Sequence, residues 1–260
     1  MTTEGLTTPT MTLTEAIRVR HSVRRYLDKP IEPEKVALIN RLIGEYNRES
    51  GLHIQLVSDE PLAFSTGIFK YGSFSNVRNY LALVGPKGSG CKEAVGYYGE
   101  RLVLYMQTLG LNSCWVALTY RNIKDAYRLS DGEQLKLVVA CGYGATAGHP
   151  HPQRKGAGAY YSDGRATGQP LPDWFVRGME AALLAPTAVN QQKFHFTLLP
   201  DDRVKAESRF SVYGNTAYDL GIVKCHFELA AGKDHFRWAD RACPIVPPHK
   251  GRENRPELNL

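Results

Sequence analysis

Two short segments of the sequence carry side chains that can bind an anion or a flat polar ligand. The first, residues 18–25, reads RVRHSVRR. In an extended segment alternate side chains share a face, so Arg20, Ser22 and Arg24 are expected to point to one site. Guanidinium groups bind phosphate oxygens in a bidentate manner, and His21 is a further donor beside them. The segment predicts a phosphate site, although a solvated basic turn would have the same composition.

The second segment, residues 185–192, reads APTAVNQQ and lies between an apolar helix pattern and an apolar strand pattern. Pro186 ends the helix, and the two small residues after it leave room for a flat ligand against the backbone. The side-chain amides of Asn190 and Gln192 can both donate and accept hydrogen bonds. Taken alone, the segment also has the composition of an ordinary polar loop.

The elements that must position these segments follow from capping signals and periodicity. Thr12 and Glu15 form a capping box at the start of a first helix, and Pro33 begins an amphipathic second helix. The patterns predict helices over 12–20, 33–44, 93–109, 173–184 and 218–231, and strands over 54–57, 80–84, 115–118, 135–141 and 194–199. The alternation of helices and strands indicates a mixed α+β protein.

Composition narrows the class of protein. The chain has 260 residues, of which 43% are hydrophobic, and a net charge of +6. Because no apolar run approaches the roughly 18 residues of a membrane span and the start is polar, we expect a cytoplasmic protein with no membrane partner. The five cysteines form no CxxC pair, so we expect free packing residues and no metal site. The cations cluster at one short segment without a nucleic-acid-binding motif, which argues against a nucleic-acid partner.

Together the two segments resemble the signatures of the FMN-dependent nitroreductase family. Arg20, Ser22 and Arg24 are similar to its basic R-x-S-x-R. The second segment is similar to its A-P-S-x-x-N-x-Q-P-W loop, with matches at Pro186, Thr187, Ala188, Asn190 and Gln192. Thr187 stands for the usual serine and keeps the hydroxyl, and Lys193 stands for the usual proline. The resemblance implies that these residues, with His21, bind FMN.

Two further segments between them resemble the same family. Residues 109–115, LGLNSCW, are similar to its LGLGSCW, whose backbone lies along the isoalloxazine edge, so Asn112 and Ser113 are implied at the flavin edge. Asn112 replaces a glycine and is expected at a positive φ. Arg154 and Lys155, after a Gly-Tyr pair, resemble the family's basic phosphate contacts.

The order of the motifs differs from that of ordinary members of this family. Those are homodimers in which the A-P-S loop follows soon after R-x-S-x-R, whereas here about 160 residues separate the two. Glycines at 99 and 110 bracket one long helix pattern as those at 221 and 232 bracket another, and a tryptophan follows each, Trp115 and Trp238. The resemblance therefore implies a nitroreductase-like fold of two related α/β halves that form an intramolecular pseudo-dimer. Coincidence between two glycine-punctuated helices is the alternative.

This organisation sets the expected boundaries and stoichiometry. We expect a flexible tail over 1–11, a first half over 12–155 with the phosphate side of the site, and a linker over 156–172. A truncated second half follows over 173–242, and an extended tail over 243–260. One FMN per chain and a monomer are implied, because the two halves together supply one complete set of motifs.

The implied activity is that of an FMN-dependent oxidoreductase. Hydride would pass from NADH or NADPH through N5 of FMN to a small electron-poor acceptor such as a nitro compound, a quinone or an enone. No catalytic side chain is expected, because the flavin carries the reaction. Residues 64–74, with Phe69 and Tyr71, are the expected wall for the acceptor. Alternatives on the same scaffold are a flavin oxidase or dehydrogenase and a flavin-binding sensor without turnover.

Overall fold

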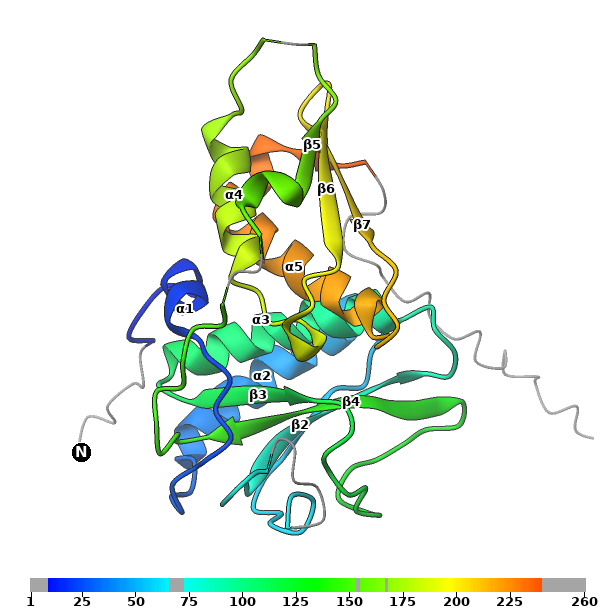
Figure 1. Ribbon diagram of the computed structural model, residues 1–260. Helices are drawn as coiled ribbons and strands as arrows, with labels where there is room; N and C mark the ends of the chain where they lie inside the picture. The colour runs from blue at the N-terminus through cyan, green and yellow to red at the C-terminus, as the bar shows by residue number, and fades with distance from the viewer. Residues whose placement is uncertain (1–8, 66–72, 153–154, 167, 240–260) are drawn as a thin grey trace, which may run out of the picture.

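The computed structural model describes residues 9–65, 73–152, 155–166 and 168–239. Their elements form two four-stranded sheets that lie at opposite ends of the molecule in Figure 1, with the helices α3 and α5 between them. Four residues of the sequence-based expectations lie outside the described residues. They are Arg154, Cys243, and Phe69 and Tyr71 of the expected acceptor wall.

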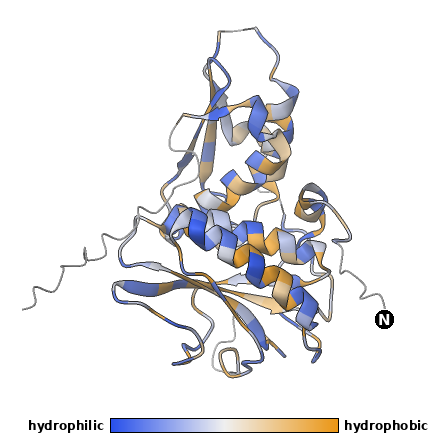
Figure 2. Cartoon of the chain, turned by 180° about the vertical axis from the view of Figure 1, so that it is seen from behind, coloured by the Kyte–Doolittle hydropathy of each residue, from blue (hydrophilic) through white to orange (hydrophobic). Residues whose placement is uncertain are grey.

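The first sheet has the order β1-β2-β4-β3 and is antiparallel throughout. Three helices, α1 to α3, belong to the same part of the chain. The bounds are α1 Leu13–Val19, α2 Pro33–Ser50, β1 Gln55–Val57, β2 Asn79–Pro86, α3 Lys92–Thr108, β3 Asn112–Val116 and β4 Glu133–Gly142. In Figure 2 polar and apolar residues form separate patches on the helices that cover this sheet, as amphipathic helices require.

The second sheet has the order β5-β6-β7-β8, with β6 and β7 antiparallel and both outer pairs parallel. The bounds are η1 Ala157–Ala159, β5 Tyr161–Asp163, α4 Asp173–Leu183, η2 Ala188–Asn190, β6 Phe194–Leu199, β7 Arg203–Ser208, α5 Thr216–Ala231, η3 Lys233–His235 and β8 Arg237–Trp238. Residues 156–172, expected as a linker, contribute β5 to this sheet. Unlike the segment 54–57 at β1, the three residues of β5 form no apolar run, which is why the sequence did not predict it.

The two central helices cross at glycines. A Cβ atom built on Gly96 of α3 would lie 2.1 Å from the carbonyl oxygen of Tyr218, and one built on Gly221 of α5 would lie 2.0 Å from that of Glu93. Real Cβ contacts never come so close, so only glycine permits this approach. The crossing is reciprocal, since each glycine lies against the residue three positions before the other.

Local signals explain where several elements begin and end. The capping box at Thr12 is confirmed, because its side chain accepts a hydrogen bond from the Glu15 backbone and Glu15 accepts one from Thr12 in return. The predicted end of the second helix near Gly44 is wrong, since α2 continues to Ser50. A single interior glycine costs a helix little, and the real end is Gly51, which has a left-handed φ of 70°.

The expected positive φ at Asn112 is also wrong. Asn112 is the first residue of β3, and the turn before the strand uses Gly110, with a φ of 78°. The Asn112 side chain accepts a hydrogen bond from the backbone of Gly144 at 3.0 Å. Its role in the structure is therefore to tie β3 to the chain that leaves β4.

Two other expectations concern the cysteines and membrane-spanning helices. The cysteines at 91, 114, 141 and 225 are buried, as expected for packing residues. Within the described residues, no helix combines the length and the apolar character needed to cross a membrane.

Candidate functional site

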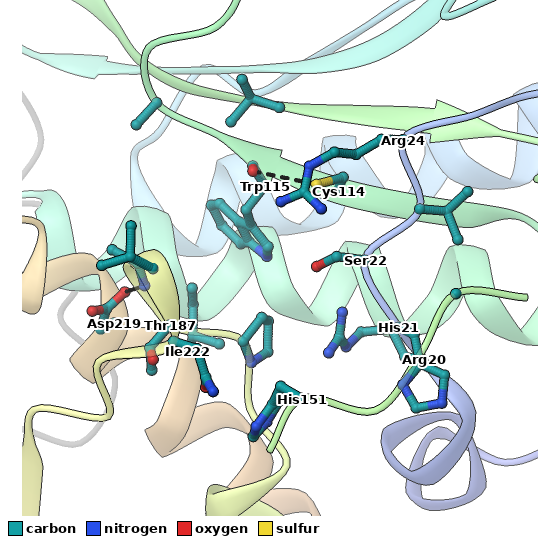
Figure 3. Close-up of a pocket in the computed structure, with 18 of the residues that line it drawn as sticks. Arg20, His21, Ser22, Arg24, Cys114, Trp115, His151, Thr187, Asp219 and Ile222 are labelled. Atoms are coloured by element: carbon teal, nitrogen blue, oxygen red, sulfur yellow. Dashed lines mark hydrogen bonds between the residues drawn. The ribbon is translucent and has the colours of Figure 1, made fainter. Parts of the chain in front are cut away.

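A cavity of about 660 Å³ lies where the two predicted segments meet. About 160 residues separate the two segments in the sequence, and the fold brings them together. Eight of the predicted residues line this cavity: Arg20, His21, Ser22, Arg24, Pro186, Thr187, Ala188 and Asn190. In Figure 3 Arg20, His21 and His151 lie toward one side of the pocket, and Thr187, Asp219 and Ile222 toward the other. Its size suits a cofactor or another small molecule.

The basic segment reaches the pocket as extended backbone, as predicted. α1 ends at Val19, and the chain then runs beside β3: Ser22 forms a parallel bridge with Ser113, and the Val23 amide donates to the Ser113 carbonyl at 3.0 Å. Val23, between Ser22 and Arg24, is buried in an apolar cluster with Tyr26 and Val116. Side-chain alternation then places Ser22 and Arg24 along the cavity.

Arg20 is held by a buried carboxylate. Its Nε atom lies 3.7 Å from Oε1 of Glu100, which is fully buried in α3. The same carboxylate accepts a hydrogen bond from Trp115 Nε1 at 2.7 Å and lies 2.8 Å from His226 Nε2. Burial lowers the pKa of Arg20, and the charge of Glu100 opposes that effect. Glu100 therefore joins α3, β3 and α5 beneath the pocket.

The loop of residues 185–192 is strained and is held by contacts from a neighbouring helix. Val189, Asn190 and Gln192 have φ angles of 46°, 50° and 45°, in the left-handed region that β-branched and bulky residues avoid. Asp219 of α5 accepts a hydrogen bond from the Ala188 amide at 2.9 Å and one from the Gln191 side chain at 3.0 Å. These contacts hold the loop in place at the start of α5.

Comparison with known proteins agrees with this geometry. The model of a family described as "Putative TM nitroreductase" matches residues 12–231. The chain belongs to this nitroreductase family. None of the curated proteins matches it.

Several solved structures with a similar fold are described as nitroreductases. A "putative nitroreductase" from Thermotoga maritima is 22% identical, each chain covers 86% of its length in the match, and the TM-score is 0.61. This likeness confirms the predicted nitroreductase-like fold of helices and sheets. A "putative NADH dehydrogenase/NAD(P)H nitroreductase" from Bacteroides thetaiotaomicron is 21% identical over 55% of this chain and 93% of that one, with a TM-score of 0.44. A "putative nitroreductase in complex with FMN" from Desulfovibrio desulfuricans is 19% identical over 62% and 99%, with a TM-score of 0.43.

Four predicted residues of this nitroreductase do not line the pocket. Asn112 and Ser113 lie just before the part of β3 that does, which begins at Cys114. Gln192 is buried and donates to the Leu183 carbonyl at 3.0 Å, so its amide holds the loop to α4. Lys155 lines a separate hollow beside Lys193 and Arg209.

Several pocket residues were not predicted from the sequence. They are Cys114, Trp115, His149, His151, Tyr218 and Asp219. Trp115 ends the LGLNSCW motif, so its place at the pocket was predictable from the sequence. Asp219 gave no signal, because one carboxylate in the first turn of a helix is a common stabilising feature.

The electrostatics of the pocket favour an anion at the arginine end. Desolvation lowers the pKa of His21, and the neighbouring charges of Arg20, His151 and His149 lower it further. Burial raises the pKa of the Cys114 thiol, although Arg24 opposes the shift. The thiol is therefore protonated at neutral pH and is no nucleophile.

Asp219 makes folding stability depend on pH. Burial raises its pKa from 3.8 to about 6, although the hydrogen bonds from Ala188 and Gln191 act in the opposite direction. Since the folded-state pKa is raised, the stabilisation is complete below about pH 4 and is lost as the pH rises through about 6. We expect the free energy of unfolding of the wild type to fall by about 2 kcal/mol between about pH 4 and pH 7, relative to an Asp219→Asn variant. Urea unfolding of both proteins at about pH 4 and pH 7 measures this, and a constant difference would contradict it.

Proposed function

We propose that this protein binds FMN in the pocket and passes hydride from NADH or NADPH to a small electron-poor acceptor such as a nitro compound, a quinone or an enone. The observation that carries the proposal is the convergence of the R-x-S-x-R segment and the A-P-T loop on one cavity. Membership of a nitroreductase family supports it.

Unsatisfied polar atoms in the pocket fit such a ligand. Among the described residues, five buried side-chain atoms lack a hydrogen-bond partner, and four of them belong to pocket residues: Arg20 Nε, both ring nitrogens of His151, and Asn190 Oδ1. Buried polar groups are normally paired, so a ligand with matching polar groups is expected to complete them. FMN offers a phosphate, a ribityl chain and a ring edge with donors and acceptors.

The residues divide between the two ends of this ligand. We expect Arg20, Ser22 and Arg24 to hold the phosphate, because guanidinium groups match its oxygens. Glu100 holds the guanidinium of Arg20, and the backbone at Ser22 is bridged to β3. The loop around Thr187 and Asn190 is expected to contact the flavin ring. When bound, FMN supplies hydride acceptance and donation at its ring, and no acid or nucleophile from the chain is required.

The apolar side chains of the pocket have a complementary role. Val116, Ile222 and Tyr218 line the same cavity and are buried or nearly so. Burial raises the pKa of Tyr218 to about 12, so its phenol is protonated and uncharged at neutral pH. This wall is expected to exclude water from the reacting ring while it accepts flat donors and acceptors in turn.

We further propose that the chain is an intramolecular pseudo-dimer with one flavin site and works as a monomer. The reciprocal contacts of Gly96 with Tyr218 and of Gly221 with Glu93 support this, because two helices related by a two-fold axis make such contacts. The corresponding glycines would then be 96 and 221, three residues away from the match of 99 with 221 suggested by the sequence.

Flavin titration and half-reactions test the function. We expect the purified protein to bind one FMN per chain, to be bleached by NADH or NADPH without oxygen, and to be reoxidised by a nitroaromatic compound. Size-exclusion chromatography with light scattering should give a monomer. A chain that binds no flavin would contradict the proposal. A flavoprotein that neither nicotinamide reduces would instead support an oxidase, a dehydrogenase or a sensor.

A further inference from the structure

One segment of the pocket belongs to neither predicted motif. Residues 148–152 run between the two halves of the site. At one end, Gly148 has a φ of 75°, and a Cβ built there would lie 2.8 Å from Cβ of His21 and 3.2 Å from the Ser22 carbonyl oxygen. At the other end, the Pro152 carbonyl accepts a hydrogen bond from the Asn190 side chain at 3.0 Å. The segment is therefore held against both motifs at once.

His149 and His151 therefore line the same cavity as Arg20 and His21, and Figure 3 shows His151 in it. The proximity is also evident in the electrostatics, since the charges of His149 and His151 act on His21. Both ring nitrogens of His151 are buried and have no hydrogen-bond partner among the described residues. A buried imidazole without partners is costly unless a ligand supplies them.

The charged groups around these histidines favour an anion over a metal ion. They are Arg20, His21, Arg24 and Arg25 from the basic segment, Glu100 from α3 and Asp219 from α5. Glu100 is already paired with Arg20, and Asp219 lies with the A-P-T loop, which it supports. The guanidinium groups repel a cation from this end of the pocket, and they attract a phosphate.

We propose that His149 and His151 bind the phosphate of the flavin nucleotide together with Arg20 and Arg24, in the role that the sequence pattern suggested for Arg154 and Lys155. The proposal rests on the proposed function. Lys155 lines a different hollow, whereas the two histidines are in the cavity.

Binding of FMN and riboflavin to the flavin-free protein tests this subsite, because the two ligands differ only in the phosphate. Dissociation constants follow from quenching of flavin fluorescence. For the wild type we expect FMN to bind at least about tenfold more tightly than riboflavin.

Two variants separate the histidines from the residues suggested by the sequence pattern. The double variant His149→Gln, His151→Gln should bind FMN about tenfold more weakly than the wild type and should bind riboflavin as the wild type does. Unchanged riboflavin binding also shows that the variant is folded. Lys155→Gln, the matched control, should bind both flavins as the wild type does.

Each contrary result has a distinct meaning. Wild-type affinity of the double variant for FMN, or an equal loss for both flavins, would overturn the phosphate role of the histidines. A loss of FMN affinity in Lys155→Gln alone would return the phosphate contact to the residue suggested by the sequence. If the wild type binds both flavins equally, the subsite is refuted and the flavin function stands. If it binds neither, both proposals fail.

Discussion

Replacing Gly96 or Gly221 by alanine is expected to lower the free energy of unfolding by at least about 3 kcal/mol. The added methyl group would lie 2.1 Å from the Tyr218 carbonyl oxygen in the first case and 2.0 Å from that of Glu93 in the second. Both obstacles are helix backbone, which cannot rotate away as a side chain can, so α3 and α5 would have to separate. Urea unfolding followed by circular dichroism measures the loss.

Gly44→Ala is the matched control for this prediction. Gly44 lies inside α2, and a Cβ built there meets only the end of the Arg48 side chain, at an ordinary 3.6 Å. Alanine is a better helix former than glycine by about 0.5–1 kcal/mol, so this variant should be slightly more stable than the wild type. If Gly96→Ala behaved like Gly44→Ala, close approach of the two helices would not be a requirement of this fold.

The second large effect is expected at Glu100. Its carboxylate is fully buried and faces Arg20, Trp115 and His226. In a Glu100→Ala variant the Arg20 guanidinium loses its counter-charge, and the indole N–H of Trp115 loses its acceptor. Breaking one side of a buried ion pair costs about 3–5 kcal/mol. We expect a loss of this size in the free energy of unfolding, together with weaker flavin binding, because Arg20 and Trp115 both line the pocket.

Glu100→Gln separates the charge from the hydrogen bonds. Nδ1 of His226 faces the Ala181 carbonyl at 3.0 Å and must donate to it, so in a neutral ring Nε2 can accept. The glutamine amide can donate to that nitrogen while its oxygen accepts from Trp115. We therefore expect a smaller stability loss than in Glu100→Ala, although Arg20 loses its counter-charge in both variants. Equal losses in the two variants would show that the charge next to Arg20, and not the hydrogen bonds, maintains this cluster.

Most of the central helices and strands were predictable because their signals are local, but β7, an inner strand of the second sheet, was not predicted. The capping box of α1, the apolar face of α3 and the alternation in β6 depend only on neighbours in the sequence. Element ends were less predictable. Whether Gly44 or Gly51 ends α2 depends on which one adopts a left-handed conformation, and that choice is made by the tertiary surroundings. The short edge strands β5 and β8 exist only because β6 and β7 offer them backbone partners.

For the candidate site, the sequence by itself determined the two motif segments and the kind of ligand they suit. Eight of the predicted residues line one cavity. They were predictable because the chemistry of the arginines, the hydroxyl and the small polar loop follows from the residue types. Tertiary structure decided which of the other polar residues join them. It places His149, His151 and Asp219 in the pocket and Lys155 outside it. The physical reason is that these positions depend on contacts between segments far apart in the sequence, which no local pattern can predict. The main contacts are the close crossing of α3 and α5 and those of residues 148–152 with both motifs.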